Sequence, residues 1–159
     1  MLDSFLNPNS ALPATRDGGR RAWRTASRGA LMSGMILLSC WARADVYQEV
    51  NDKINAGQWT VAQTLIDQQL QKQPADPQMR LMRSQMQAAQ GQTVLAMEGL
   101  QVLTQEFPEL PEPYNNLAVL LAQQQRFDEA LTHLKLAVRA RSDYSLALEN
   151  LGDIYIALA

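Results

Sequence analysis

Apolar side chains in the second half of the chain recur at the spacing of one helix face. Within residues 111–124, Tyr114, Leu117, Ala118 and Leu121 stand at i, i+3, i+4 and i+7. A helix with 3.6 residues per turn brings these positions onto one side, and the intervening positions are mostly polar or small. The pattern therefore predicts an amphipathic helix.

A second predicted helix follows the first almost at once. Pro111 and Pro113 mark the start of the first helix, because proline has no backbone N–H and a fixed φ that suits a first helical turn. After residues 125 and 126, the same apolar spacing resumes at Phe127, Ala130, Leu131, Leu134, Ala137 and Val138. So short a connection predicts an antiparallel helix pair.

Similar residues also recur every 34 positions. Several independent positions agree on this period, which is the mark of a repeat architecture. The matching sets are Ala62, Ala96 and Ala130; Ile66, Leu100 and Leu134; Gly57 and Gly91; Pro74 and Pro108; and, two periods apart, Trp59 and Phe127.

The 34-residue unit resembles the tetratricopeptide repeat, in which small and large apolar residues alternate at fixed positions of two helices. The residues that carry the resemblance are Tyr114, Leu117, Ala118, Leu121, Phe127, Ala130, Leu134 and Ala137, whereas Ser142 replaces the usual proline. The frame gives repeats at 43–76, 77–110 and 111–144 and a half repeat at 145–159. The resemblance implies an all-α fold, a right-handed α-solenoid of antiparallel helix pairs. Arg80 and Arg83 depart from it, because they occupy normally apolar positions.

The first 44 residues have a different character and predict a signal peptide. Arginines precede an uncharged stretch, residues 29–42, which is followed by a small-residue site ending at Ala44. The uncharged stretch is short for a stable membrane span, so an uncleaved inner-membrane anchor is the weaker interpretation. Residues 37–40 resemble a lipobox, which keeps open an outer-membrane lipoprotein processed at Cys40. A mitochondrial transit peptide is disfavoured, because the apolar run is continuous rather than amphipathic.

Composition and charge exclude several functional classes. The chain has one cysteine and one histidine, too few for a protein-only zinc site or a Cys–His nucleophile pair. The formal net charge of −2 lacks the positive excess that is typical of nucleic-acid-binding domains. Cleavage after Ala44 would remove six arginines and two aspartates, leaving a more acidic domain at 45–159. We expect no catalytic residues, no metal and no cofactor, and by resemblance His133 lies on an exposed face.

The resemblance implies that the first helix of each repeat lines a concave surface that binds protein partners. Amide side chains both donate and accept hydrogen bonds, so they can bind the backbone of an extended peptide; the alternative is a solvated helix face. Asn116 and Asn150 share one repeat position and are the strongest candidates. The candidate partner-binding residues are Asn51, Leu81, Gln85, Asn115, Asn116, Val119, Gln123 and Asn150.

The last predicted helix is apolar on more than one side, whereas a terminal helix of a repeat array should have a polar outer face. Residues 145–158 include Leu146, Leu148, Leu151, Ile154, Tyr155, Ile156 and Leu158. We expect this face to be covered, either by a helix that follows in a longer chain, which we favour, or by a second copy or another protein.

The sequence thus predicts a periplasmic, non-catalytic scaffold or adaptor in the envelope of a Gram-negative bacterium. It would bind an extended peptide or a partner helix in the concave groove. The alternative is an accessory regulatory subunit of an envelope enzyme, in peptidoglycan synthesis or cytochrome maturation. The membrane would be contacted only through the signal segment or a lipid on Cys40.

Overall fold

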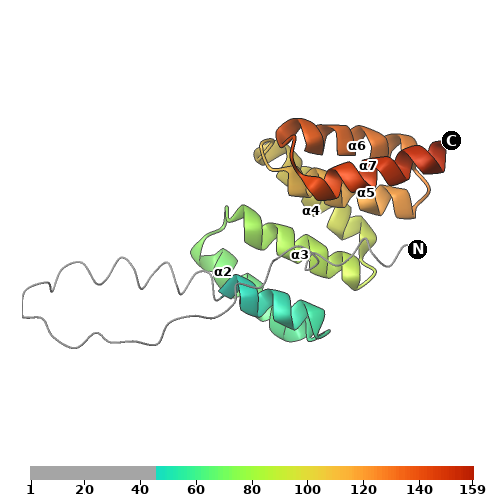
Figure 1. Cartoon of the computed structure of the whole chain (residues 1–159). Coiled ribbons are helices and arrows are strands. Elements are labelled where there is room, and N and C mark those ends of the chain that lie inside the picture. The colour runs from blue at the N-terminus through green and yellow to red at the C-terminus, as the bar shows by residue number, and fades with distance from the viewer. Residues whose placement is uncertain (1–45) are drawn as a thin grey trace, which may run out of the picture. The chain divides into compact units, whose positions relative to one another are not determined.

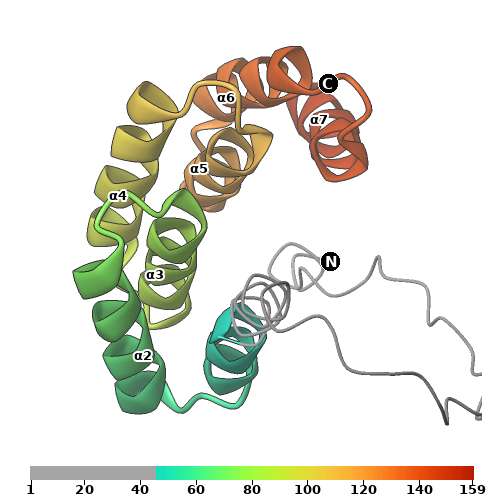
Figure 2. The same ribbon diagram turned by 90° about the vertical axis from the view of Figure 1, so that its left-hand side faces the viewer.

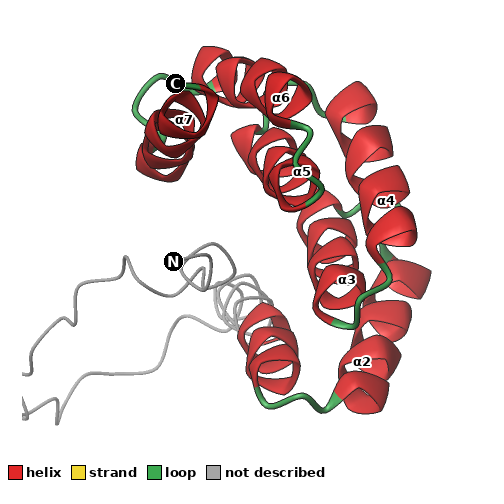
Figure 3. Ribbon diagram, turned by 90° about the vertical axis from the view of Figure 1, so that its right-hand side faces the viewer, coloured by secondary structure: helices red, strands yellow, loops and turns green. Residues whose placement is uncertain are grey.

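The described part of the chain is built of helices packed in sequence. The computed structural model describes residues 46–159; the predicted signal segment, with Cys40 and Ala44, lies outside them. Residues 46–55 are helical, and residues 46–159 contain no strand (Figures 1 and 3). The helices that follow are α2 (Trp59–Lys72), α3 (Pro77–Ala89), α4 (Thr93–Glu106), α5 (Pro111–Gln123), α6 (Phe127–Ala140) and α7 (Ser145–Leu158). The prediction of an all-α solenoid of paired helices is confirmed.

The helices form two layers. Figure 2 shows α2, α4 and α6 along the outer side of the curved stack, and α3, α5 and α7 along its inner side. Each helix contacts the next along the chain, and α5 also contacts α7. The inner layer therefore contains the first helix of each repeat.

The turn within each repeat needs one residue in the left-handed region. Gly57 has a φ of 68° and Gly91, one period later, a φ of 75°. The third equivalent position is Gln125, which has a φ of 61° although its Cβ makes that conformation costly. The backbone conformation thus repeats every 34 residues even where the glycine does not.

Small residues stand where the helices approach closely. Ala62, Ala96 and Ala130 have no exposed surface, and Ala118 is also buried. A larger side chain at these sites would push two helices apart. Gly152 differs, because it is exposed.

A polar contact fixes the start of the second repeat. One carboxylate oxygen of Asp76 accepts the backbone N–H of Met79 at 3.0 Å, which caps α3. The other accepts the hydroxyl of Tyr47 at 2.7 Å. Asp76 therefore joins the helical residues 46–55 to the N-terminus of α3.

The two arginines that depart from the repeat pattern have acidic partners on neighbouring helices. Arg80 forms an ion pair with Glu106 of α4, and its guanidinium carbon lies 6.0 Å from the ring centroid of Phe107. Arg83 forms an ion pair with Asp67 of α2. Ion pairs thus replace apolar contacts on either side of α3.

Candidate functional site

The inner layer buries four of the eight candidate binding residues. Leu81 of α3, Asn115 and Val119 of α5, and Asn150 of α7 are all buried in the stack. A buried side chain cannot reach a partner without movement of its helix. In this conformation these four residues hold the repeats together.

The buried amides bond to one another. The side-chain nitrogen of Asn150 donates to the side-chain oxygen of Asn115 at 2.8 Å, across the contact between α5 and α7. The nitrogen of Asn115 donates to the side-chain oxygen of Asn116 at 3.4 Å. Asn116 and Asn150 share a repeat position but not an environment, since Asn116 is only half-buried.

The other four candidate residues reach the surface. Asn51, Gln85 and Asn116 are half-buried, and Gln123 is exposed. They come from residues 46–55, α3 and α5, which line the inner side of the stack in Figure 2. These are the amides of the predicted set that a partner can contact.

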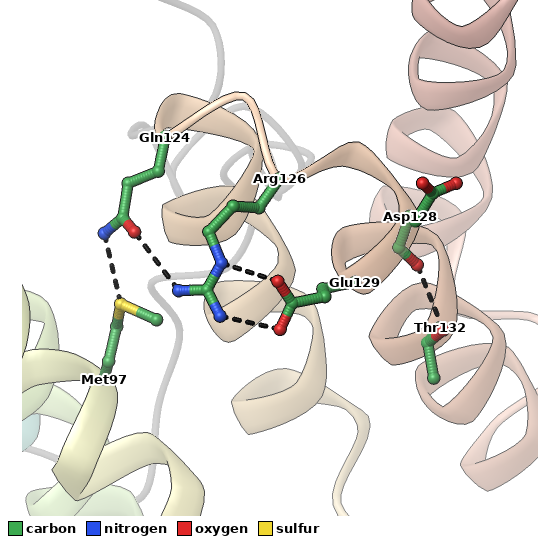
Figure 4. A network of polar contacts seen from close by, with 6 residues as sticks. All are labelled: Met97, Gln124, Arg126, Asp128, Glu129 and Thr132. Carbon is green, nitrogen blue, oxygen red and sulfur yellow. Dashed lines mark hydrogen bonds and ion pairs between the residues drawn. The ribbon is translucent and has the colours of Figure 1, made fainter.

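A polar network surrounds the turn between α5 and α6 (Figure 4). The amide of Gln124 donates to the sulfur of Met97 at 3.4 Å and its oxygen accepts from Arg126 at 3.3 Å. Arg126 binds both carboxylate oxygens of Glu129 at 2.6 Å, and this hydrogen bonding holds the pKa of Glu129 below its ordinary value. Asp128 and Glu129 lie in the first turn of α6, where negative charge is favourable.

His133 is half-buried rather than exposed. Burial lowers the pKa of its imidazole, and the carboxylate of Glu129 opposes that change. Its buried Nδ1 has no hydrogen-bond partner among the described residues. A repeat-position argument could not foresee this, because burial here depends on the particular neighbours of α6.

The last helix presents apolar side chains to solvent, as its sequence predicts. Leu148, Tyr155, Ile156 and Leu158 are exposed on α7, whereas Ile154 is buried against the stack. An exposed cluster of large apolar residues at the end of a stack is a common feature of interaction surfaces.

Residues 46–159 contain neither a candidate metal site nor a candidate membrane-spanning helix. No group of three or more His, Cys, Asp or Glu side chains in this part of the chain could hold a metal ion. None of the helices described there combines the length and apolarity needed to cross a bilayer.

Solved structures similar to this chain share its fold. The tetratricopeptide repeat domain of Sgt2 from Aspergillus fumigatus is 18% identical with a TM-score of 0.64, over 72% of this chain and 78% of that one. YrrB, described as a tetratricopeptide repeat protein with an unusual peptide-binding site, is 20% identical with a TM-score of 0.58, over 66% of this chain and 54% of that one.

A chain of the Naa15/Naa10 complex bound to HypK-THB is 19% identical with a TM-score of 0.65; the match covers 72% of this chain and spans 17% of that chain's length. No curated protein sequence matches significantly. The sequence model of the tetratricopeptide repeat matches residues 47–111 and 114–158, which is most of the chain. The chain therefore belongs to the tetratricopeptide repeat family.

Proposed function

We propose that this protein is an exported interaction scaffold, which binds an extended peptide or a helix of a partner in the bacterial cell envelope. Tetratricopeptide repeats generally mediate protein–protein interaction and are generally non-catalytic. The observation that carries the proposal is the set of solvent-accessible amides on the inner helices, Asn51, Gln85, Asn116 and Gln123.

These amides suit the backbone of a peptide. Each offers two N–H donors and a carbonyl acceptor, so it can pair with a peptide group whatever side chain that residue carries. Gln85 and Asn116 lie on neighbouring inner helices, α3 and α5. A peptide that runs across these helices would meet one amide after another.

Export is supported by the order of features in the first 44 residues. Arginines, then a short apolar stretch, then Ala42 and Ala44 form the layout of a cleaved signal peptide. The periplasm is the proposed compartment; an outer-membrane lipoprotein processed at Cys40 and an inner-membrane anchor are the alternatives. The intact mass of the protein from its host distinguishes them: an N-terminus at Asp45 supports cleavage, and a lipidated Cys40 excludes it.

The groove is tested by affinity purification of the full chain from cross-linked cells. The Gln85→Ala/Asn116→Ala double variant should lose the captured partners. Gln101→Ala is the matched control, since Gln101 is an exposed amide on the outer helix α4. If the double variant captured the same partners as the parent chain, a role of Gln85 and Asn116 in partner binding would be excluded. Recovery of a peptidoglycan synthase or a cytochrome maturation enzyme would identify the protein as an accessory subunit.

A further inference from the structure

The methionines of the described chain differ in their access to solvent. Residues 46–159 contain four, and three of them, Met79, Met82 and Met86 of α3, are 0%, 4% and 1% exposed. Met97 of α4 is half-buried and packs against the outside of the core cluster that contains Leu100. A methionine is oxidised where an oxidant reaches its sulfur, so Met97 is the thioether of this part of the chain that a small oxidant reaches.

The sulfur of Met97 faces a hydrogen-bond donor. The side-chain nitrogen of Gln124 donates to it at 3.4 Å in a solvent-exposed contact, which Figure 4 shows. A thioether sulfur is only a weak acceptor, and a methionine at the edge of a core usually has apolar neighbours. The N–H donor beside Met97 is therefore stronger than its present acceptor requires.

Neighbouring side chains fix the direction of that donor. The side-chain oxygen of Gln124 accepts from Nη1 of Arg126 at 3.3 Å, and Arg126 donates two bonds of 2.6 Å to Glu129 (Figure 4). Because the guanidinium occupies the oxygen, the amino end of the Gln124 amide points toward α4. A cation that donates to the amide oxygen also polarises its N–H groups and makes them better donors.

We propose that Met97 is a reversible oxidation site, where the oxygen of methionine sulfoxide accepts the N–H of Gln124. A lone pair of the sulfur attacks hydrogen peroxide, the O–O bond breaks, and water leaves as the sulfur loses two electrons. A sulfoxide reductase with a dithiol reverses the step and yields the thioether, a disulfide and water. The proposal goes beyond partner binding and does not depend on it.

The network explains why the fold accommodates this oxygen. A sulfoxide oxygen carries partial negative charge and is a much stronger acceptor than a thioether, and at Met97 a donor is already in place. The three methionines of α3 lie in an apolar cluster, where an added oxygen would be buried without a donor. Oxidation of Met97 should therefore preserve the contact between α4 and the turn that joins α5 to α6.

Peptide mass spectrometry of the full chain tests the site itself. After treatment with hydrogen peroxide at neutral pH, Met97 should be oxidised about tenfold faster or more than Met79, Met82 and Met86. Methionine sulfoxide reductases for both epimers, supplied with dithiothreitol, should restore the unmodified mass. The proposal is wrong if Met97 reacts no faster than the three buried methionines or if its sulfoxide resists both reductases.

Thermal unfolding before and after peroxide treatment tests the part played by Gln124. Oxidation should lower the midpoint of the parent chain by about 2 °C or less, and that of Gln124→Leu by about 4 °C or more. Gln90→Leu is the matched control, because Gln90 stands one period earlier in the preceding turn, and it should behave like the parent. Met97→Leu, treated in the same way, gives the shift due to all other methionines, which is subtracted.

Equal shifts in the parent and in Gln124→Leu would show that the amide does not hold the sulfoxide, and a large shift in both would show that the fold does not accommodate it. Nuclear magnetic resonance gives a readout that does not depend on stability. The side-chain amide protons of Gln124, assigned by their loss in Gln124→Leu, should move downfield when Met97 is oxidised, because a stronger acceptor deshields them. Unchanged resonances in the oxidised parent would overturn the proposal.

Discussion

The side-chain nitrogen of Asn150 donates a 2.8 Å hydrogen bond to the side-chain oxygen of Asn115, and both residues are buried between α5 and α7. A buried hydrogen bond between neutral side chains contributes modestly, but a buried donor or acceptor left alone costs about 1–3 kcal/mol. The pair therefore stabilises the contact between the third repeat and α7 mainly because each side chain supplies the hydrogen-bond partner that the other would lack when buried.

Asn150→Met should lower the free energy of unfolding by about 1–3 kcal/mol, because it leaves the oxygen of Asn115 buried without its donor. Each position accepts an apolar side chain elsewhere in the stack, since Leu81 and Met82 are buried at the positions equivalent to Asn115 and Asn150. The Asn115→Leu/Asn150→Met double variant should recover most of that loss. Urea unfolding of the parent chain, the two single variants and the double variant measures the coupling energy between the two side chains. Additive losses would contradict a direct hydrogen bond between them.

The hydrophobic pattern was sufficient to predict the helix pairs, and it placed α5, α6 and α7 close to their observed bounds. It could not predict that Asn115 and Asn150 bond to each other, because a 34-residue frame assigns them to different positions. Equivalent positions share a backbone geometry but not neighbours, so Asn116 reaches the surface where Asn150 does not. The burial of candidate site residues is thus a property of the whole stack rather than of one repeat.

Two helical glycines should respond in opposite ways to alanine. Gly152→Ala should raise the free energy of unfolding by about 1 kcal/mol, because it improves helix propensity in open space. Gly99→Ala should lower it by about 1–2 kcal/mol through overpacking, since the new Cβ would lie 2.5 Å from the hydroxyl oxygen of Ser84.

Ser84→Ala supplies the control for Gly99→Ala. It removes the oxygen that a Cβ would meet and leaves the Ser84 Cβ at 3.7 Å, an ordinary contact. In that background Gly99→Ala should cease to destabilise. Denaturant unfolding decides: an equal loss in both backgrounds would place the cause outside the Ser84–Gly99 contact.

Alkaline pH should destabilise the fold through Tyr144. Burial raises the pKa of this phenol to about 12, the carboxylate of Glu112 adds to the rise, and Arg141 opposes it. The unfolded state loses the proton near the ordinary value of 10.0 while the folded state retains it, so stability present below pH 10.0 is lost as pH rises through about 12.

Tyr144→Phe should remove this part of the alkaline loss. Ultraviolet titration of the parent chain should show a late component from Tyr144 that is absent in the variant. Identical titration curves, after correction for one fewer phenol, would show that Tyr144 is not the late component.

Arg83→Leu should leave the free energy of unfolding unchanged or raise it by up to about 1 kcal/mol. The Nε of Arg83 is buried without a hydrogen-bond partner among residues 46–159, and its ion pair with Asp67 is partly solvated. Such a pair offsets little of the cost of burying a guanidinium, and an apolar side chain of similar volume often serves as well. Leu117 stands at the equivalent position of α5 and is buried, so the fold accepts leucine there.

Arg83→Ala is the contrasting variant, because it removes the packing of the side-chain stem as well as the charge. Thermal unfolding at low and high salt separates the two: Arg83→Ala should be the less stable at both, and a large salt-dependent loss in Arg83→Leu would show that the ion pair stabilises the junction between α2 and α3.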